Sequence, residues 1–128
     1  SFSSCNKDKD RKVSNSERLI GEWIYRTTQE KINGEWKDMP TQVGAEGTQT
    51  FYKDGKALIT MTFEGEYKEQ KFEWNLKDNN DFIINGTVRG QILFESNDCF
   101  YFYSDETFDP EAGENIKGEF RDIYDRKK

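Results

Sequence analysis

The chain has 128 residues, of which 33% are hydrophobic and 34% are charged, and its net charge is −6. Aromatic residues make up 15% of the chain, a ring content that argues against intrinsic disorder, and the length suits one domain. No apolar run approaches the roughly 20 residues of a membrane-spanning helix, and the acidic balance without a basic stripe argues against nucleic acid as a partner.

The N-terminus contains Phe2-Ser3-Ser4-Cys5, an apolar residue and two small residues before a cysteine. This motif resembles the lipobox of bacterial lipoproteins, where the signal is cleaved before a cysteine that is then acylated. The polar residues 6–12 suit a solvated tether. We therefore expect residues 1–18 to hold a signal remnant, the lipidated Cys5 and a flexible tether, anchored to the bacterial outer membrane on its periplasmic or cell-surface side. The alternative is an ordinary polar tail with a chance cysteine.

From Leu19 onward, short alternating apolar runs separated by turn residues predict β-strands. Asn33-Gly34 and Asp54-Gly55 are the strongest hairpin signals, because both positions of each dipeptide tolerate positive φ. The predicted strands are 19–29, a short pairing segment 35–39, then 48–53, 56–63, 67–77, 82–88, 91–95, 99–104 and 116–124. Segments 39–47 and 105–115 carry proline and glycine and are predicted to be loops.

This pattern gives about eight antiparallel strands with no helix longer than a turn or two. An open sheet of that size would leave two exposed edges, whereas an up-and-down β-barrel has none. We therefore predict an all-β fold, a single eight-stranded barrel over residues 19–128, and expect a monomer. A two-sheet β-sandwich is the alternative, since the sequence does not show whether the first and last strands meet.

Gly21-Glu22-Trp23 at the start of the first strand resembles the Gly-x-Trp signature of lipocalins. The segments "LIGEWIY" and "NGEWKDM" and the ring-rich strands after them are similar to lipocalin-like domains of bacterial lipoproteins, over roughly residues 19–124. In lipocalins an arginine of the last strand lies over this tryptophan at the barrel floor. The resemblance therefore implies that Arg121 makes a cation–π contact with Trp23.

Apolar residues on the alternating positions of the strands are expected to face the barrel interior. They either fill the core or line a cavity for a small apolar or amphipathic ligand, since eight-stranded barrels occur in both states. The candidates for the cavity lining are Met61, Phe63, Phe72, Trp74, Phe100 and Phe102.

Tyr101 and Tyr103 alternate with Phe100 and Phe102, so a regular strand places these tyrosines on the outer face. A covered pair would pack beneath the chain's own N-terminal segment or beneath residues 105–115. An uncovered pair would offer a surface to a protein or glycan partner, because tyrosine is common at such sites.

Catalytic and metal-binding residues are scarce in this chain. It contains no histidine and only two cysteines, Cys5 and Cys99, so neither a Cys/His zinc site nor a histidine-activated nucleophile can form. A disulfide between them is possible by count, but the aromatic neighbours of Cys99 favour a buried thiol. We expect no metal, no cofactor and no enzymatic activity. The sequence favours a ligand-binding envelope lipoprotein, with a filled barrel that binds a protein or glycan partner as the alternative.

Overall fold

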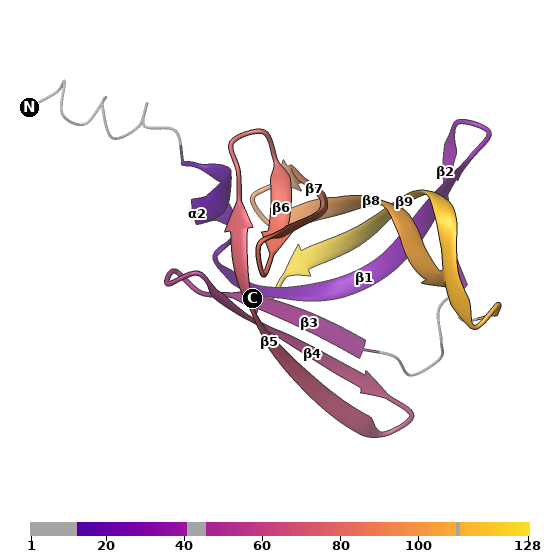
Figure 1. The fold of residues 1–128 in the computed structure, drawn as a ribbon, viewed down its shortest axis with the longest axis horizontal. Coiled ribbons are helices and arrows are strands. Elements are labelled where there is room, and N and C mark those ends of the chain that lie inside the picture. Colours follow the sequence, from indigo (N-terminus) through magenta and orange to yellow (C-terminus); the bar gives the residue numbers. More distant parts are fainter. Residues whose placement is uncertain (1–12, 41–45, 110) are drawn as a thin grey trace, which may run out of the picture.

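A computed structural model describes residues 13–40, 46–109 and 111–128. Cys5 and the expected tether 6–12 lie outside these residues. The described part of the chain forms one short helix and nine strands (Figure 1), and the helix is too short to cross a bilayer. The elements are α2 (Asn15–Leu19), β1 (Gly21–Ile32), β2 (Glu35–Asp38), β3 (Glu46–Phe51), β4 (Lys56–Phe63), β5 (Glu66–Leu76), β6 (Asp81–Ile84), β7 (Thr87–Ser96), β8 (Cys99–Asp109) and β9 (Glu114–Arg126).

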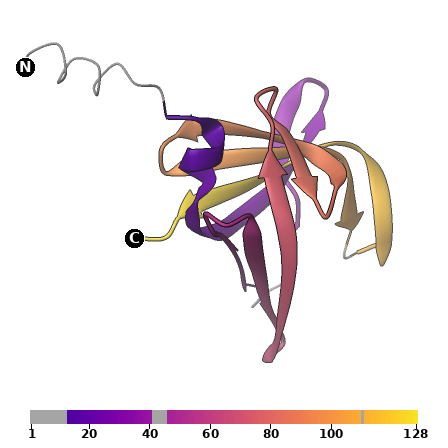
Figure 2. The ribbon, with the colours of Figure 1, turned by 60° about the vertical axis from the view of Figure 1, so that its left-hand side comes forward.

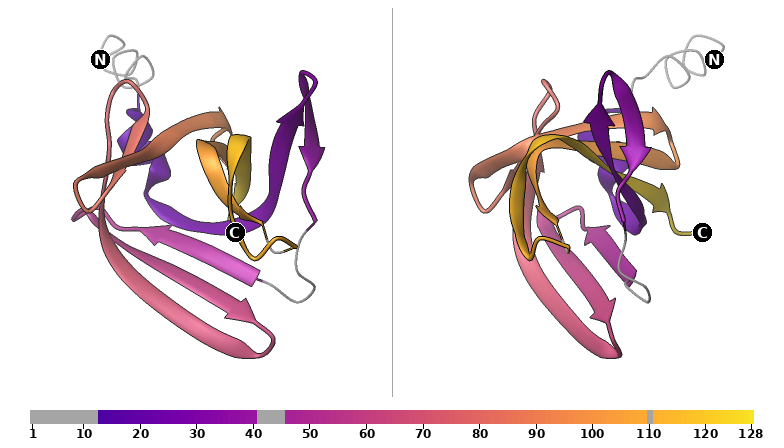
Figure 3. Two further views of the ribbon diagram at one scale, coloured as in Figure 1. Left: turned by 45° about the vertical axis from the view of Figure 1, so that its right-hand side comes forward. Right: turned by 90° about the vertical axis from the view of Figure 1, so that its right-hand side faces the viewer.

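Eight of the strands close into an antiparallel barrel. Each of β3 to β8 pairs with the next strand along the chain, and the circle closes because β1 pairs with β3 on one side and with β9 on the other. The ninth strand, β2, pairs with the last residues of β1 and lies outside the closed circle of strands (Figure 3). The prediction of a closed up-and-down barrel is therefore confirmed and the sandwich alternative is wrong.

The predicted strand 82–88 is wrong, because the chain turns within it. Asn85 and Gly86 have φ of 50° and 83°, the left-handed backbone of a two-residue hairpin turn. Strand β6 therefore ends at Ile84, and β7 begins at Thr87 and continues through the predicted turn at Arg89-Gly90. The shift of register between Phe82 and Ile83 places the extra residue of this longer strand in a β-bulge.

The predicted loop 105–115 is also wrong over most of its length. Strand β8 continues to Asp109, β9 begins at Glu114, and these extensions pair from Glu106↔Lys117 to Asp109↔Glu114. The acidic side chains therefore lie along a hairpin that projects beyond the barrel, with Phe108 exposed on it.

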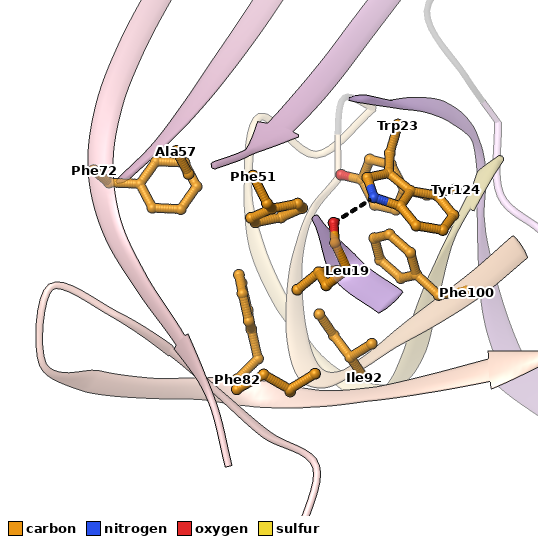
Figure 4. Packing of buried hydrophobic residues seen from close by; sticks show 10 residues of the cluster. Leu19, Trp23, Phe51, Ala57, Phe72, Phe82, Ile92, Phe100 and Tyr124 are labelled. Atoms are coloured by element: carbon orange, nitrogen blue, oxygen red, sulfur yellow. Dashed lines mark hydrogen bonds between the residues drawn. The ribbon is translucent and has the colours of Figure 1, made fainter. Parts of the chain in front are cut away.

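Aromatic rings fill the closed end of the barrel (Figure 4). Phe100 packs edge-on against Trp23 at 4.7 Å between ring centroids and stacks on Tyr124 at 5.0 Å. Phe51 packs similarly against Phe82 at 5.8 Å. Such pairs add about 0.5–1.5 kcal/mol each beyond the burial of their area. The buried cluster comprises Leu19, Trp23, Phe51, Ala57, Phe72, Leu76, Phe82, Ile92, Phe100 and Tyr124.

Helix α2 covers this end of the barrel. Ser14 caps it by accepting a hydrogen bond from the backbone N–H of Glu17, and the Ser16 hydroxyl ties it to the carbonyl of Leu76 at the end of β5. Leu19 is fully buried, and its carbonyl accepts a 2.8 Å hydrogen bond from the indole nitrogen of Trp23 (Figure 4). The chain segment before the Gly-x-Trp motif is thereby fixed to the barrel floor.

The arginine over Trp23 is Arg126, not Arg121. The guanidinium carbon of Arg126 lies 4.3 Å from the centre of the Trp23 ring, and Trp23 pairs with Arg126 across β1 and β9. Arg121 belongs to the other face of β9, where it contacts Trp36 and Tyr101. Gly21 accommodates this arrangement, since its φ is 130° and a Cβ there would lie 2.8 Å from Nη1 of Arg126.

The opposite end of the barrel is open because its strands diverge. Strands β1 and β3 pair only from Gly21↔Phe51 to Ile24↔Thr48, after which β1 pairs with β2 instead. The β4–β5 hairpin projects away from the rest of the barrel (Figures 1 and 2). Its inner face is consequently uncovered, and Met61 is 54% exposed.

Candidate functional site

A cavity of about 340 Å³ occupies the open half of the barrel interior. A smaller void of about 70 Å³ lies on the side of the filled core, and the two share Gln49, Asp122 and Tyr124. These three side chains therefore form the boundary between the cavity and the ring-packed floor. The larger cavity is lined by Tyr25, Thr28, Glu46, Gly47, Thr48, Gln49, Ile59, Thr60, Met61, Thr62, Phe63, Thr107, Asp122 and Tyr124.

The structure separates the six predicted cavity residues into groups. Met61 and Phe63 line the larger cavity, together with Ile59 of the same strand. Phe100 and Phe102 border only the small void. The other two, Phe72 and Trp74, lie in or against the packed core and border neither cavity. The barrel interior is thus filled at one end and hollow at the other.

A hydrogen-bonded chain of polar side chains crosses the floor of the cavity. Thr28 Oγ1 donates to Asp122 Oδ1 at 2.7 Å, so the 2.5 Å bond between Tyr25 and Thr28 requires the tyrosine hydroxyl to donate. Nearby, Gln49 Nε2 donates to the hydroxyl of Tyr124 at 2.7 Å. The Tyr124 hydroxyl thereby retains a hydrogen that it can donate to another group.

Burial governs the ionisation of these groups. It raises the pKa of the Asp122 carboxyl, and the hydrogen bond from Thr28 opposes that rise. Burial also raises the pKa of Tyr25 and, further, of Tyr124, and the negative charge of Asp122 adds to both. At neutral pH both tyrosines are therefore neutral hydrogen-bonding groups, and Asp122 is the carboxyl group among the described residues of the floor.

No lysine or arginine is among the described residues that line the cavity. The charged residues of this described lining are Asp122 on the floor and Glu46 at the mouth. Within the described residues, no cluster of three histidine, cysteine, aspartate or glutamate side chains could hold a metal ion. The site is therefore acidic, with apolar side chains on one wall and hydrogen-bonding groups on its floor.

The polar floor is the part of the site that the sequence analysis missed. Asp122 lies between Phe120 and Tyr124 on the same face of β9, the face that points inward. A charged residue on the apolar face of a strand is a signal that the sequence contains. Gln49 offers the same signal on β3, since it precedes the buried Phe51 by two positions.

Tyr101 and Tyr103 lie on the outer face of β8. Of the two predicted covers, the N-terminal residues 1–12 lie outside the described residues, and the described part of 105–115 forms the end of the β8–β9 hairpin. Tyr103 packs edge-on against Trp36 of β2 at 5.8 Å between centroids. The guanidinium carbon of Arg121 lies 4.4 Å from the Trp36 ring and 4.5 Å from the Tyr101 ring. Trp36 of the β1–β2 hairpin therefore packs on Tyr103, Arg121 of β9 packs on Tyr101, and both tyrosines are half-buried. This arrangement favours a structural role.

Cys99 is buried, as its aromatic neighbours predict, and forms no disulfide within the described part of the chain. Burial raises the pKa of its thiol to about 11. The thiol is consequently protonated at neutral pH, so it lacks the thiolate form that acts as a nucleophile.

No family model matches this chain, and no curated protein matches it. Similar solved structures include the odorant-binding protein from bovine nasal mucosa, with a TM-score of 0.46 and 14% identity over 93% of this chain and 77% of that one. The complex of bovine odorant-binding protein with undecanal gives 0.46 and 15% over the same shares. Its complex with a selenium-containing odorant gives 0.47 and 14% over 93% and 76%. Similarity at this level implies no shared ligand, and the strand pairings alone establish the barrel.

Proposed function

We propose that this protein is a lipocalin-like barrel that binds a small amphipathic molecule in its open end and performs no catalysis. The observation that carries the proposal is the cavity of about 340 Å³ inside the barrel. Ligand sites are typically concave, about 300–1,000 Å³ in volume, and mostly apolar with a few fixed polar groups. The apolar wall of Ile59, Met61 and Phe63 and the polar floor around Asp122 fit that description.

The arrangement of the interior also supports a fixed site. The rings of the closed end pack directly beneath Gln49 and Tyr124, and this packing holds the floor of the cavity in place. A bound molecule would place its apolar part against β4 and its polar end on the floor. The protonated thiol of Cys99 and the absence of histidine from the sequence support a binding role without catalysis.

Filling the cavity with a protein side chain should abolish ligand binding. A Cβ on Gly47 would make only ordinary contacts, 3.6 Å to the carbonyl oxygen of Thr60 and 3.7 Å to Cβ of Tyr25, so Gly47→Phe should fold and place a ring in the cavity. We expect isothermal titration calorimetry with n-octanol to show binding to the unmodified protein and a loss of more than about tenfold in the variant.

Thr50→Phe is the matched control, because position 50 lies on the other face of β3 and borders no part of the cavity. This variant should bind n-octanol with unchanged affinity. Equal binding by Gly47→Phe, or no binding by the unmodified protein, would rule out the cavity as a site for apolar molecules. Circular dichroism of both variants establishes whether the barrel is folded.

We further propose that Cys5 is lipidated and anchors the barrel to the bacterial envelope as a lipoprotein. The motif Phe2-Ser3-Ser4-Cys5 and the polar segment after it support this proposal. The Cys5→Ser substitution in the full-length precursor should remove the acyl group and shift the protein from the membrane fraction to the soluble fraction. Unchanged fractionation of the Cys5→Ser protein, measured by immunoblot beside the unmodified precursor, would contradict the proposal.

A further inference from the structure

Among the described residues, no positively charged side chain pairs with the Asp122 carboxyl group on the cavity floor. Its Oδ1 accepts the hydrogen bond from Thr28, and no other described residue donates a hydrogen bond to the carboxylate. Arg121, which precedes Asp122 on β9, belongs to the outer face and donates a hydrogen bond to Gln29. A half-buried carboxylate loses part of its solvation, and among the described residues only the neutral hydroxyl of Thr28 donates a hydrogen bond to it.

Each strand around Asp122 presents neutral groups to it. Strand β1 contributes Tyr25 and Thr28, β8 contributes Phe102, and β3 contributes Gln49. Tyr124 lies beside it on β9, and Glu46 is the other charged residue of the lining. Lys68, which pairs with Met61 on the projecting β4–β5 hairpin, is exposed and does not line the cavity.

We propose that the cavity selects amphipathic amines, with a protonated amino group bound to Asp122 and an apolar chain or ring against Ile59, Met61 and Phe63. This inference rests on the proposed function and names the class of ligand that the site takes. The ammonium group would supply the missing positive charge and donate hydrogen bonds to the Asp122 carboxylate and to the side-chain carbonyl of Gln49. Glu46 at the mouth would attract the same charge and repel carboxylates.

Three ligands of equal chain length separate this inference from the proposed function. n-Octylamine is protonated at neutral pH, n-octanol is neutral and octanoate is negatively charged. At pH 7 we expect calorimetry to give n-octylamine about 10–100-fold higher affinity than n-octanol, since hydrogen bonds to charged groups are stronger than those between neutral groups. Octanoate should have the lowest affinity of the three.

The Asp122→Asn variant tests the residue itself. It keeps an oxygen that can accept from Thr28 but removes the charge, so the ratio of n-octylamine affinity to n-octanol affinity should fall to about one. Asp125→Asn is the matched control, because that carboxylate lies three positions along β9 and pairs with Arg26 outside the cavity. The Asp125→Asn variant should keep the preference for n-octylamine. Its melting temperature should remain close to that of the unmodified protein.

The pH dependence should follow the same carboxyl group. Because burial raises the pKa of Asp122, the preference for n-octylamine should be lost on acidification at a higher pH than for an exposed aspartate, while n-octanol still binds. Equal affinities of n-octylamine and n-octanol at pH 7, or a preference that survives Asp122→Asn, would overturn the inference and leave the proposed function standing. Failure of all three ligands to bind would overturn both.

Discussion

Truncating Phe100 to alanine should lower the free energy of unfolding by about 3–5 kcal/mol, which is the usual cost of removing a buried ring from a packed core. Phe100 is 1% exposed and contacts Trp23, Phe94 and Tyr124, so its removal leaves a hole that β-strands fixed by barrel closure cannot collapse to fill. Urea denaturation followed by circular dichroism measures the change. The loss is large compared with the 5–15 kcal/mol total stability of a typical domain.

Phe63→Ala is the matched substitution in the hollow half of the barrel. Phe63 is half-buried at the cavity mouth, so we expect a loss of about 1 kcal/mol in stability but a several-fold weaker affinity for n-octanol. The two variants together test whether the interior is divided into a filled part and a lined part. Similar losses in the free energy of unfolding of both variants would show that the rings at the mouth stabilise the barrel as much as those at the floor, and would contradict this division.

The strand pattern was predictable because most of its signals are local. The turns Asn33-Gly34 and Asp54-Gly55 lie between strands, as the dipeptides predict, and Gly34 and Gly55 both have positive φ. Asn85-Gly86 carries the same signal but lies within the run 82–88, whose β-branched residues favour one continuous strand. The local turn preference prevailed there, because ending β6 early lets β7 extend and pair along β8.

The closure of the barrel could be predicted from the edges that an open sheet would expose. That prediction did not require knowledge of the pairing register. The identity of the arginine over Trp23 did require the register. Alternation along the last strand places Phe120 and Tyr124 on the inner face, and the same alternation places Arg121 outside. Arg126, at an even spacing from both, was compatible with the floor, but only the pairing of Trp23 with Arg126 identifies it.

The cavity itself could not be located from the sequence, because it depends on where strands separate. The divergence of β1 and β3 after Ile24 and the bulge between Tyr25 and Thr27 bring Thr28 inward to meet Asp122. A strand without that bulge would turn Thr28 to the outer face, since each one-residue shift reverses the side-chain directions. The inward positions of Asp122 and Gln49 could be read from alternation, but the contact of Thr28 with Asp122 depends on a register irregularity that residue patterns do not reveal.

Replacing Arg126 by alanine should lower the free energy of unfolding by about 2–4 kcal/mol, whereas Arg121→Ala should cost about 1 kcal/mol or less. The Arg126 guanidinium donates hydrogen bonds to the carbonyls of Arg18, Ile20 and Asn97, at 2.7–3.1 Å, and lies over the Trp23 ring. These contacts join the segment before β1, the β7–β8 turn and the end of β9. The lost donors would leave partly buried carbonyls without partners.

Arg126→Lys tests whether geometry or charge is responsible. A lysine keeps the charge near Asp98, which lies 3.3 Å from Nε of Arg126, but it lacks the planar fork that reaches three carbonyls at once. We expect it to recover less than half of the loss in urea denaturation. Arg121→Ala keeps all of these contacts. It removes the outer-face contacts of Arg121 with Trp36 and Tyr101 and its hydrogen bonds to Gln29 and Tyr103. A larger loss for Arg121→Ala than for Arg126→Ala would place the stabilising arginine outside the barrel and contradict its role at the floor.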